Sequence, residues 1–172
     1  MNIIPNTTPI KIFSRQAIER ATATNPDFPV AIISITDVFE PLANIQANAN
    51  IRGCLRLQFD DVYEDEDGAM CAADAQKIAE FLYEIDENHI EAEQIWIHCE
   101  GGVSRSAAVA AAIAKAWFNN DMWVFQNPNY YPNAWVNKLV TEALGEEWDE
   151  DEFKQKMKIN IEIYNERCDN NG

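Results

Sequence analysis

The sequence predicts a layered α/β fold within a single domain of 172 residues. Apolar, β-branched segments of strand type alternate along the chain with segments whose apolar residues recur at helical spacing. Apolar residue types make up 47% of the chain, which is enough to build an ordinary hydrophobic core at this length. No internal repeat or Gly/Ser-rich linker interrupts the sequence, so we expect one folded unit over residues 1–172.

The strands of this fold are predicted from three short segments. Residues 29–36 are almost uniformly apolar and rich in β-branched types, which predicts a buried strand. Residues 54–59 alternate apolar and polar side chains, which is typical of a half-buried strand nearer the edge of a sheet. Residues 95–97 form a short β-rich run that ends just before a glycine-containing loop.

Helices account for most of the remaining core. Residues 72–88 carry apolar side chains at helical spacing, and residues 104–119 form an alanine-rich helix that we expect near the centre of the fold. A one-sided apolar stripe over 136–144 predicts a further helix. Near the start of the chain, Ser14 is a candidate N-cap for a short helix that extends through Ala21.

The C-terminal part of the chain is strongly acidic. An acidic run at 146–152 leads into a last helix that carries the apolar residues of 153–164. We therefore expect the core of the domain over about residues 25–145, with an acidic helical extension over about 146–168.

The net charge of −16 limits the partners of the protein. The whole acidic excess lies in residues 61–172, which carry 24 acidic and eight basic side chains. Because such a surface repels phosphate backbones and anionic lipid, we expect no nucleic-acid or membrane partner. The sequence also lacks the apolar run of a membrane helix, and its first residues do not resemble a signal peptide. A cytoplasmic monomer is the simplest expectation.

The cysteines do not form a disulfide framework or a metal site. They stand at positions 54, 71, 99 and 168, without a CxxC pair or metal-ligand spacing, and the chain has only two histidines. We expect free thiols and no bound metal.

Residues 97–106, which read IHCEGGVSRS, carry the clearest chemical signal of the sequence. They fit a strand, a tight loop and the start of a helix, an arrangement in which inward backbone N–H groups and the helix N-terminus cradle an anion. Arg105 adds a planar guanidinium that can meet two oxygens of one phosphate. The residues expected to bind the anion are Glu100, Gly101, Gly102, Val103, Ser104 and Arg105.

Cys99 is expected at the floor of this cradle. There the amides and the helix dipole favour the thiolate, which lowers a cysteine pKa from about 8.5 into the range of roughly 3.5–7.5. Such a thiolate is a nucleophile aimed at a bound phosphorus atom. Ser106 is a candidate hydrogen-bond donor to the sulfur, and His98 is expected to hold the cysteine environment without titrating. The alternative interpretation, a buried core cysteine beside a glycine turn, does not explain the arginine six positions later.

The segment HCEGGVSRS resembles the phosphate loop of the dual-specificity branch of the protein-tyrosine phosphatase superfamily. The resemblance covers roughly residues 25–145, although only the loop is highly specific, and Glu100-Gly101-Gly102 departs slightly from the alanine-glycine pair common there. It implies a single domain with a twisted, mainly parallel central sheet flanked by helices. It also implies a two-step reaction through a phosphocysteine, with no metal or cofactor.

The resemblance further implies an aspartate that protonates the leaving oxygen, on a loop thirty to forty residues before the cysteine. Asp61, which stands 38 residues before Cys99, matches this position best, and Asp60 is the second candidate. Asp65 and Asp67 belong to the same acidic loop and are further candidates if the loop moves. The alternative is a solvated acidic loop without a role.

The expected substrate carries one phosphate. The cradle segment contains no lysine or histidine, and Glu100 opposes a multiply charged ligand, which favours phosphotyrosine in a protein or peptide, with phosphoserine and phosphothreonine as further substrates. The acidic residues 64–67 favour a basic or neutral peptide. Tyr63, Tyr130 and Tyr131 either line a pocket or are ordinary aromatic residues.

Two other functions fit the motif less well. One is a phosphate-binding module without turnover, and the other is a redox or sulfur-transfer enzyme, which has no CxxC pair here and no use for Arg105. Reversible oxidation of Cys99, resolved by Cys54 or Cys71, is a further regulatory hypothesis.

Overall fold

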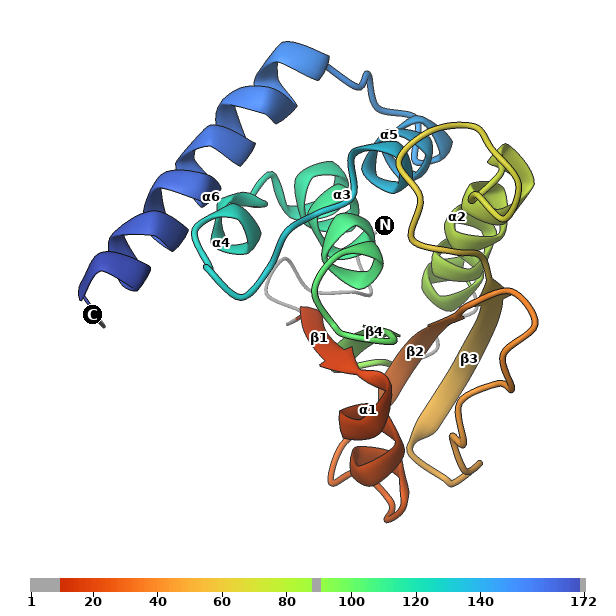
Figure 1. The fold of residues 1–172 in the computed structure, drawn as a ribbon. Coiled ribbons are helices and arrows are strands. Elements are labelled where there is room, and N and C mark those ends of the chain that lie inside the picture. The colour runs from red at the N-terminus through yellow and green to blue at the C-terminus, as the bar shows by residue number, and fades with distance from the viewer. Residues whose placement is uncertain (1–9, 88–90, 171–172) are drawn as a thin grey trace.

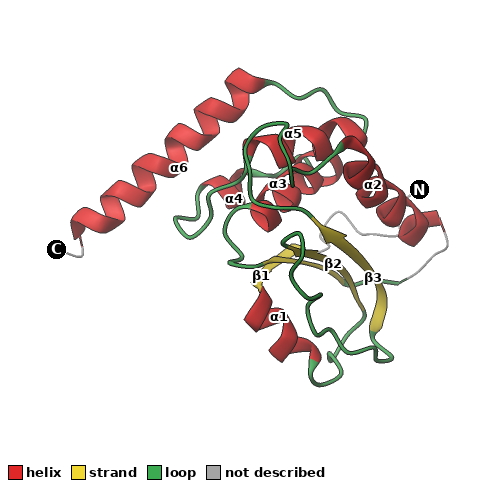
Figure 2. Ribbon diagram, turned by 45° about the vertical axis from the view of Figure 1, so that its right-hand side comes forward, coloured by secondary structure: helices red, strands yellow, loops and turns green. Residues whose placement is uncertain are grey.

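The computed structural model describes residues 10–87 and 91–170, and a parallel sheet lies at the centre of this part of the chain. Its strands are ordered β1-β4-β2-β3, and each neighbouring pair is parallel. Helices cover both faces of the sheet (Figures 1 and 2). The predicted fold class is therefore confirmed. The strands are β1 (Ile10–Ser14), β2 (Val30–Thr36), β3 (Ile51–Gln58) and β4 (Gln94–Cys99).

The helices form two unequal layers. A small layer contains α1, whose Ile18 packs with Val30, Ile32 and Trp96 of the sheet. The main core lies on the opposite face, where α2 and α3 pack against the sheet and α5 packs on both of these helices (Figure 2). The helices are α1 (Arg15–Thr22), α2 (Ala72–Glu87), α3 (Arg105–Phe118), α4 (Met122–Phe125), α5 (Ala134–Ala143) and α6 (Glu150–Asn170).

The order of the strands follows from their burial. Every residue of β2 is buried, as expected for a β-branched run covered on both faces. β3 lies at the edge of the sheet and has a mixed burial pattern, which confirms the half-buried edge strand predicted over 54–59. It begins three residues earlier than predicted, because Ile51 pairs with Val30.

The alanine-rich helix is central, as predicted. All ten residues from Arg105 to Ala114 are buried, and α3 contacts β1, β4, α4 and α5. Small side chains permit this close packing on several sides. The other predicted helices are also present: α2 is described to Glu87, while residue 88 of its predicted range lies outside the described residues.

The N-terminal helix begins as the sequence predicts. Ser14 Oγ accepts a hydrogen bond from the Ala17 N–H at 3.2 Å and so caps α1. The sequence analysis missed β1, which directly precedes this helix and pairs with β4, and it also missed the single-turn helix α4.

The last helix, α6, extends from the body of the molecule toward the C-terminus (Figure 1). Its buried residues Phe153, Met157 and Asn160 face the body, and it packs mainly on α4. Across the described residues, no helix is both long enough and apolar enough to cross a membrane.

Candidate active site

The candidate site lies where the parallel strands end. Because all strands of the sheet point the same way, their carboxyl ends meet at one edge, where parallel α/β sheets commonly bind ligands. β4 ends at Cys99, residues 100–104 form a loop, and α3 begins at Arg105. The strand, loop and helix predicted from the sequence therefore follow one another directly.

Cys99 is buried, and two groups converge on its sulfur. The Gly102 N–H donates to Sγ at 3.3 Å, and Ser106 Oγ, from the first turn of α3, lies 3.1 Å from Sγ. Both groups can direct a polar hydrogen at the sulfur.

Gly102 has a structural requirement that the neighbouring Gly101 does not share. Its φ angle is 68°, and a Cβ atom at this position would lie 2.7 Å from the Phe13 carbonyl carbon and from Ser14 N. At Gly101, the nearest atom to such a Cβ is Val103 Cγ2 at 3.8 Å. The end of β1 thus presses against the cradle loop at Gly102, and only glycine fits there.

The Arg105 side chain is held by residues that directly follow two other strands. Its Nη1 lies 2.5 Å from Asp37 Oδ1, just beyond β2, and donates to the Phe59 carbonyl at 2.6 Å, just beyond β3. The side chain is only 4% exposed, and its Nε is buried without a hydrogen-bond partner among the described residues. A buried donor in this state is costly unless a ligand oxygen completes it.

The sequence analysis did not single out Asp37. Its pairing with Arg105 joins residues 68 positions apart, and no local pattern signals such a contact.

His98 is fully buried behind the loop. Its Nε2 lies 2.7 Å from Ser34 Oγ on β2, and its Nδ1 lies 3.3 Å from the Cys99 carbonyl oxygen. Burial lowers the pKa of His98 to about 4. The hydrogen bond with Cys99 acts in the opposite direction, and the positive charges of Arg15 and Arg56 lower the pKa further. The imidazole is therefore neutral near pH 7.

Asp61 reaches the cradle, whereas Asp60 holds the loop in which both residues lie. Asp61 Oδ1 accepts hydrogen bonds from Ser104 Oγ and from Asn133 Nδ2, both at 2.8 Å. Asp60 Oδ1 accepts from the Val38 N–H at 2.9 Å, and its backbone N–H donates to Gly68 O at 2.7 Å. Of these two candidates, Asp61 is the one that accepts a hydrogen bond from a residue of the cradle loop, so the geometry favours Asp61.

The remaining loop candidates are not brought to the site by a described contact. Asp65 and Asp67 are exposed in the segment between β3 and α2. Asn133, which the sequence analysis did not single out, is fully buried. It contacts Asp61, donates to the Val62 carbonyl, and caps α5 by accepting from Val136 N–H.

Glu100 is neutralised within the protein. Its carboxylate pairs with Arg15 Nη1 at 3.0 Å, and its carbonyl accepts from the Arg15 N–H. Arg15 also pairs with Glu19 and donates to the Pro41 and Leu42 carbonyls. Arg15, the basic residue that directly follows β1, is therefore occupied by partners within the protein.

The cysteines at positions 54, 71, 99 and 168 are all free. Cys54 lies on β3, and its thiol pKa is raised by burial, although Arg56 acts in the opposite direction. Among the residues that the structure describes, no group of histidine, cysteine and carboxylate side chains is arranged to hold a metal ion.

The assembled site gathers hydrogen-bond donors beside the sulfur of Cys99, an arrangement that suits a tetrahedral anion. It combines the buried Cys99, the start of α3, the open Nε of Arg105 and an aspartate at the rim. Such an arrangement suits transfer of a phosphoryl group to sulfur and protonation of a leaving oxygen.

No family model matches the chain, and no curated protein matches it. Similar solved structures include PTPMT1, with 16% identity and a TM-score of 0.47 over 81% of this chain and 92% of that chain. Tk-PTP in the active form has 12% identity and a TM-score of 0.38 over 93% of this chain and 94% of that one. P. aeruginosa TpbA has 12% identity and a TM-score of 0.39 over 90% of this chain and 80% of that one.

The function proposed for this chain rests on the cradle loop and its contacts. In the sequence of that loop, and in the seating of Cys99 between a strand and a helix N-terminus, the chain resembles the dual-specificity branch of the protein-tyrosine phosphatase superfamily.

Proposed function

We propose that the protein is a cysteine-dependent phosphatase that hydrolyses phosphotyrosine in proteins, with phosphoserine and phosphothreonine as further substrates. The observation that carries this proposal is the convergence of Gly102 N–H and Ser106 Oγ on Cys99 Sγ at the start of α3. A core cysteine needs neither contact, whereas a nucleophilic thiolate is stabilised by both.

The first step transfers the phosphoryl group to the protein. Cys99 thiolate attacks phosphorus, an S–P bond forms, and the P–O bond to the substrate side chain breaks. Asp61 gives its proton to the departing oxygen, so the product leaves as a neutral hydroxyl group.

The second step regenerates the enzyme. Water attacks the phosphocysteine, and Asp61, now a carboxylate, takes a proton from that water. The S–P bond breaks, inorganic phosphate forms, and the sulfur leaves as a thiolate that Ser106 stabilises by a hydrogen bond at the observed position.

Arg105 and the loop amides bind the phosphoryl oxygens during both steps. Asp37 and the Phe59 carbonyl hold the guanidinium through Nη1, which leaves Nε directed to a ligand oxygen. His98 stays neutral and positions the end of β4 through Ser34 and the Cys99 carbonyl.

A single phosphate suits the surroundings of the cradle. Arg15, which lies beside the loop, is occupied by Glu100, Glu19 and two carbonyls and so is not free to bind a second phosphate. The acidic residues 64–67 also disfavour a multiply charged ligand.

The proposal is tested by hydrolysis of aryl phosphates between pH 5 and 8. We expect Cys99→Ser to abolish turnover, and Arg105→Lys to weaken it strongly, because lysine cannot replace the planar fork. Asp61→Asn should lower kcat/KM for phenyl phosphate by about 100-fold, which is the lower range for loss of a general acid. Its effect on 4-nitrophenyl phosphate should be smaller, since that leaving group needs less protonation.

Asp60→Asn is the matched control for the general acid. It changes the neighbouring carboxylate and disturbs the same loop, so it should lower both rates without dependence on the leaving group. If the leaving-group dependence follows Asp60 instead, the acid is misassigned. If the wild-type protein binds vanadate without turning over either ester, the protein is a phosphate-binding module and the proposed activity is wrong.

A further inference from the structure

A pocket of about 310 Å³ opens directly beside the cradle loop. Val103 of the loop forms one of its walls, and the carbonyl of this residue accepts a hydrogen bond from the Tyr131 N–H at 2.9 Å. The pocket is therefore attached to the candidate active site through both a side chain and the backbone. Its lining residues are Val103, Pro128, Asn129, Tyr130, Tyr131, Asn160, Ile161 and Tyr164.

The opposite wall of the pocket belongs to α6 and is held firmly in place. Asn160 is only 2% exposed, and its Nδ2 donates to the carbonyls of Phe125, Asn127 and Tyr130 at 3.0–3.3 Å. About two turns further along α6, Arg167 Nη1 donates to Asn129 Oδ1 at 2.8 Å. These bonds fix α6 against the segment that leads from α4 to α5, so the pocket is preformed.

The pocket presents apolar surface to solvent. Val103, Tyr131, Ile161 and Tyr164 are 42%, 46%, 43% and 54% exposed, and all eight lining residues are uncharged. Large apolar side chains gathered in one exposed depression are typical of a surface that binds another molecule. Of the three tyrosines that the sequence offered as pocket residues, Tyr130 and Tyr131 line this pocket and Tyr63 does not.

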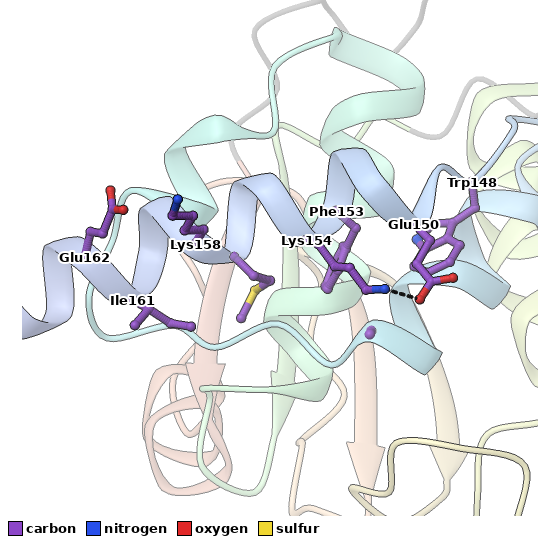
Figure 3. A pocket seen from close by; sticks show the side chains of 9 residues that line it. Trp148, Glu150, Phe153, Lys154, Lys158, Ile161 and Glu162 are labelled. Carbon is purple, nitrogen blue, oxygen red and sulfur yellow. Dashed lines mark ion pairs between the residues drawn. The ribbon is translucent and has the colours of Figure 1, made fainter.

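A second, more open groove of about 540 Å³ continues along the same helix and shares Ile161. Figure 3 shows Phe153 and Ile161 of α6 and Trp148 before it around this groove, with Lys154 and Glu150 paired at its edge. An apolar surface therefore leads from the cradle loop along α6, which lies beyond the expected core of residues 25–145.

We propose that the pocket at Val103, Tyr131, Ile161 and Tyr164 is a substrate subsite that takes a large apolar side chain of the phosphopeptide. This proposal rests on the proposed phosphatase activity, because the phosphate in the cradle brings the neighbouring peptide residues over Val103. Each extended residue spans about 3.3–3.6 Å, so an apolar residue within three positions of the phosphorylated one reaches the pocket wall.

A peptide fits this surface better than a membrane lipid does. The lining residues provide no basic side chain for an anionic headgroup, and the net charge of −16 opposes approach to an anionic bilayer. A leucine or phenylalanine side chain needs only an uncharged depression beside the phosphate site.

The test uses the full-length protein and phosphotyrosine peptides in which leucine or serine is placed in turn at each position from −3 to +3. We expect leucine to raise kcat/KM about tenfold over serine at one or two positions. Ile161→Ser and Tyr164→Ser should reduce this ratio to about twofold. Both side chains are about half exposed, so the fold should tolerate either change.

Ile159→Ser is the matched control, because Ile159 is 38% exposed on the same helix but does not line the pocket. It should keep the full leucine preference. A leucine preference that is absent, or that falls equally in the Ile159 and Ile161 variants, would overturn the subsite. More efficient hydrolysis of a phosphoinositide in phosphatidylcholine vesicles than of every peptide, with the same loss in Ile161→Ser, would overturn the peptide as the occupant.

Peptide binding by the Cys99→Ser protein separates this proposal from the proposed activity. Fluorescence anisotropy of labelled peptides measures the leucine preference without turnover. A preference in binding, together with no hydrolysis of aryl phosphates by the wild type, supports the subsite and contradicts the phosphatase. Hydrolysis of aryl phosphates without any leucine preference supports the phosphatase and contradicts the subsite.

Discussion

His98 and Cys99 are neighbours at the end of β4, but burial acts on the histidine in a way that removes it from proton transfer. The imidazole is fully buried, and the loss of solvation lowers its pKa to about 4 from an ordinary value near 6.5. Ser34 and the Cys99 carbonyl oxygen bind its two nitrogens. A group with this pKa is neutral throughout the range in which the proposed activity is to be measured.

The same burial predicts how the stability of the protein depends on pH. As the pH falls, the unfolded chain protonates His98 near pH 6.5, whereas the folded chain resists protonation until about pH 4. The stabilisation is therefore complete above about pH 6.5 and is lost as the pH falls toward 4. We expect the free energy of unfolding in urea to drop by about 2 kcal/mol between pH 7 and pH 5.

His98→Asn is the variant that isolates this effect. It removes the titrating group and keeps hydrogen-bonding capacity, so its unfolding free energy should change much less between the two pH values, whatever its absolute stability. Glu19, whose pKa is lowered first by the Asn44 N–H, loses its stabilisation mostly at lower pH and does so in both proteins. An equal pH dependence in the wild type and the variant would show that His98 does not titrate as described.

At the scale of the elements, the end of each strand delivers one group to the site. β1 is followed by Arg15, which pairs with Glu100, and β2 is followed by Asp37, which pairs with Arg105. β3 leads to Asp61, and β4 ends at Cys99. Parallel pairing brings these chain-distant residues to one edge, so the sheet itself assembles the site.

This assembly explains which parts of the site the sequence could predict. Cys99 and Ser106 belong to one short segment, so the local sequence was enough to predict the contact between them. The partners of Arg105 and Glu100 come from other strand ends, and their pairing depends on strand order, which no local pattern encodes.

The same physical limit applies to the elements. β2 was predicted because its burial on both faces leaves a continuous apolar run. β1 is short and only partly buried, and its pairing with β4 defines it as a strand more than its own composition does. The four-residue α4 is too short to show a helical period.

The attachment of α6 provides a prediction about an element. Lys156 Nζ lies 2.6 Å from both Asp121 Oδ2 and Glu152 Oε1, and the Lys156 and Asp121 side chains are only 15% and 12% exposed. Burial lowers the pKa of Lys156, but these two carboxylates outweigh it and raise the pKa overall. We expect Lys156→Met to lower the free energy of unfolding by about 3 kcal/mol, because it leaves the buried Asp121 unpaired.

Hydrogen exchange reports where this loss occurs. In Lys156→Met, amides of α6 should exchange faster than in the wild type, while those of β2 should change only as much as global stability does. Lys154→Met is the control, because Lys154 pairs with Glu150 on the exposed surface of the same helix and should leave exchange unchanged. Equal effects of the two substitutions would contradict the anchoring role of Lys156.

For the molecule as a whole, the charge distribution opposes the anionic substrate that is proposed for the site. The net charge is −16, and its excess lies in the part of the chain that follows β3. The cradle contributes local positive potential through Arg105 and the start of α3, which acts only at short range. The approach of a charged substrate is therefore governed by the long-range field, and its binding by the local one.

This separation predicts opposite salt dependences for two kinds of substrate. For a phosphotyrosine peptide flanked by glutamates, kcat/KM should rise about threefold between 20 and 200 mM NaCl, because salt screens repulsion over distances of roughly 10 Å and more. For the same peptide flanked by lysines, kcat/KM should fall by a similar factor. The value of kcat should stay nearly constant in both cases, since salt acts on encounter and not on the buried sulfur. If kcat/KM falls with salt for the acidic peptide as well, the local potential of the cradle controls approach, and the acidic surface has no influence on substrate choice.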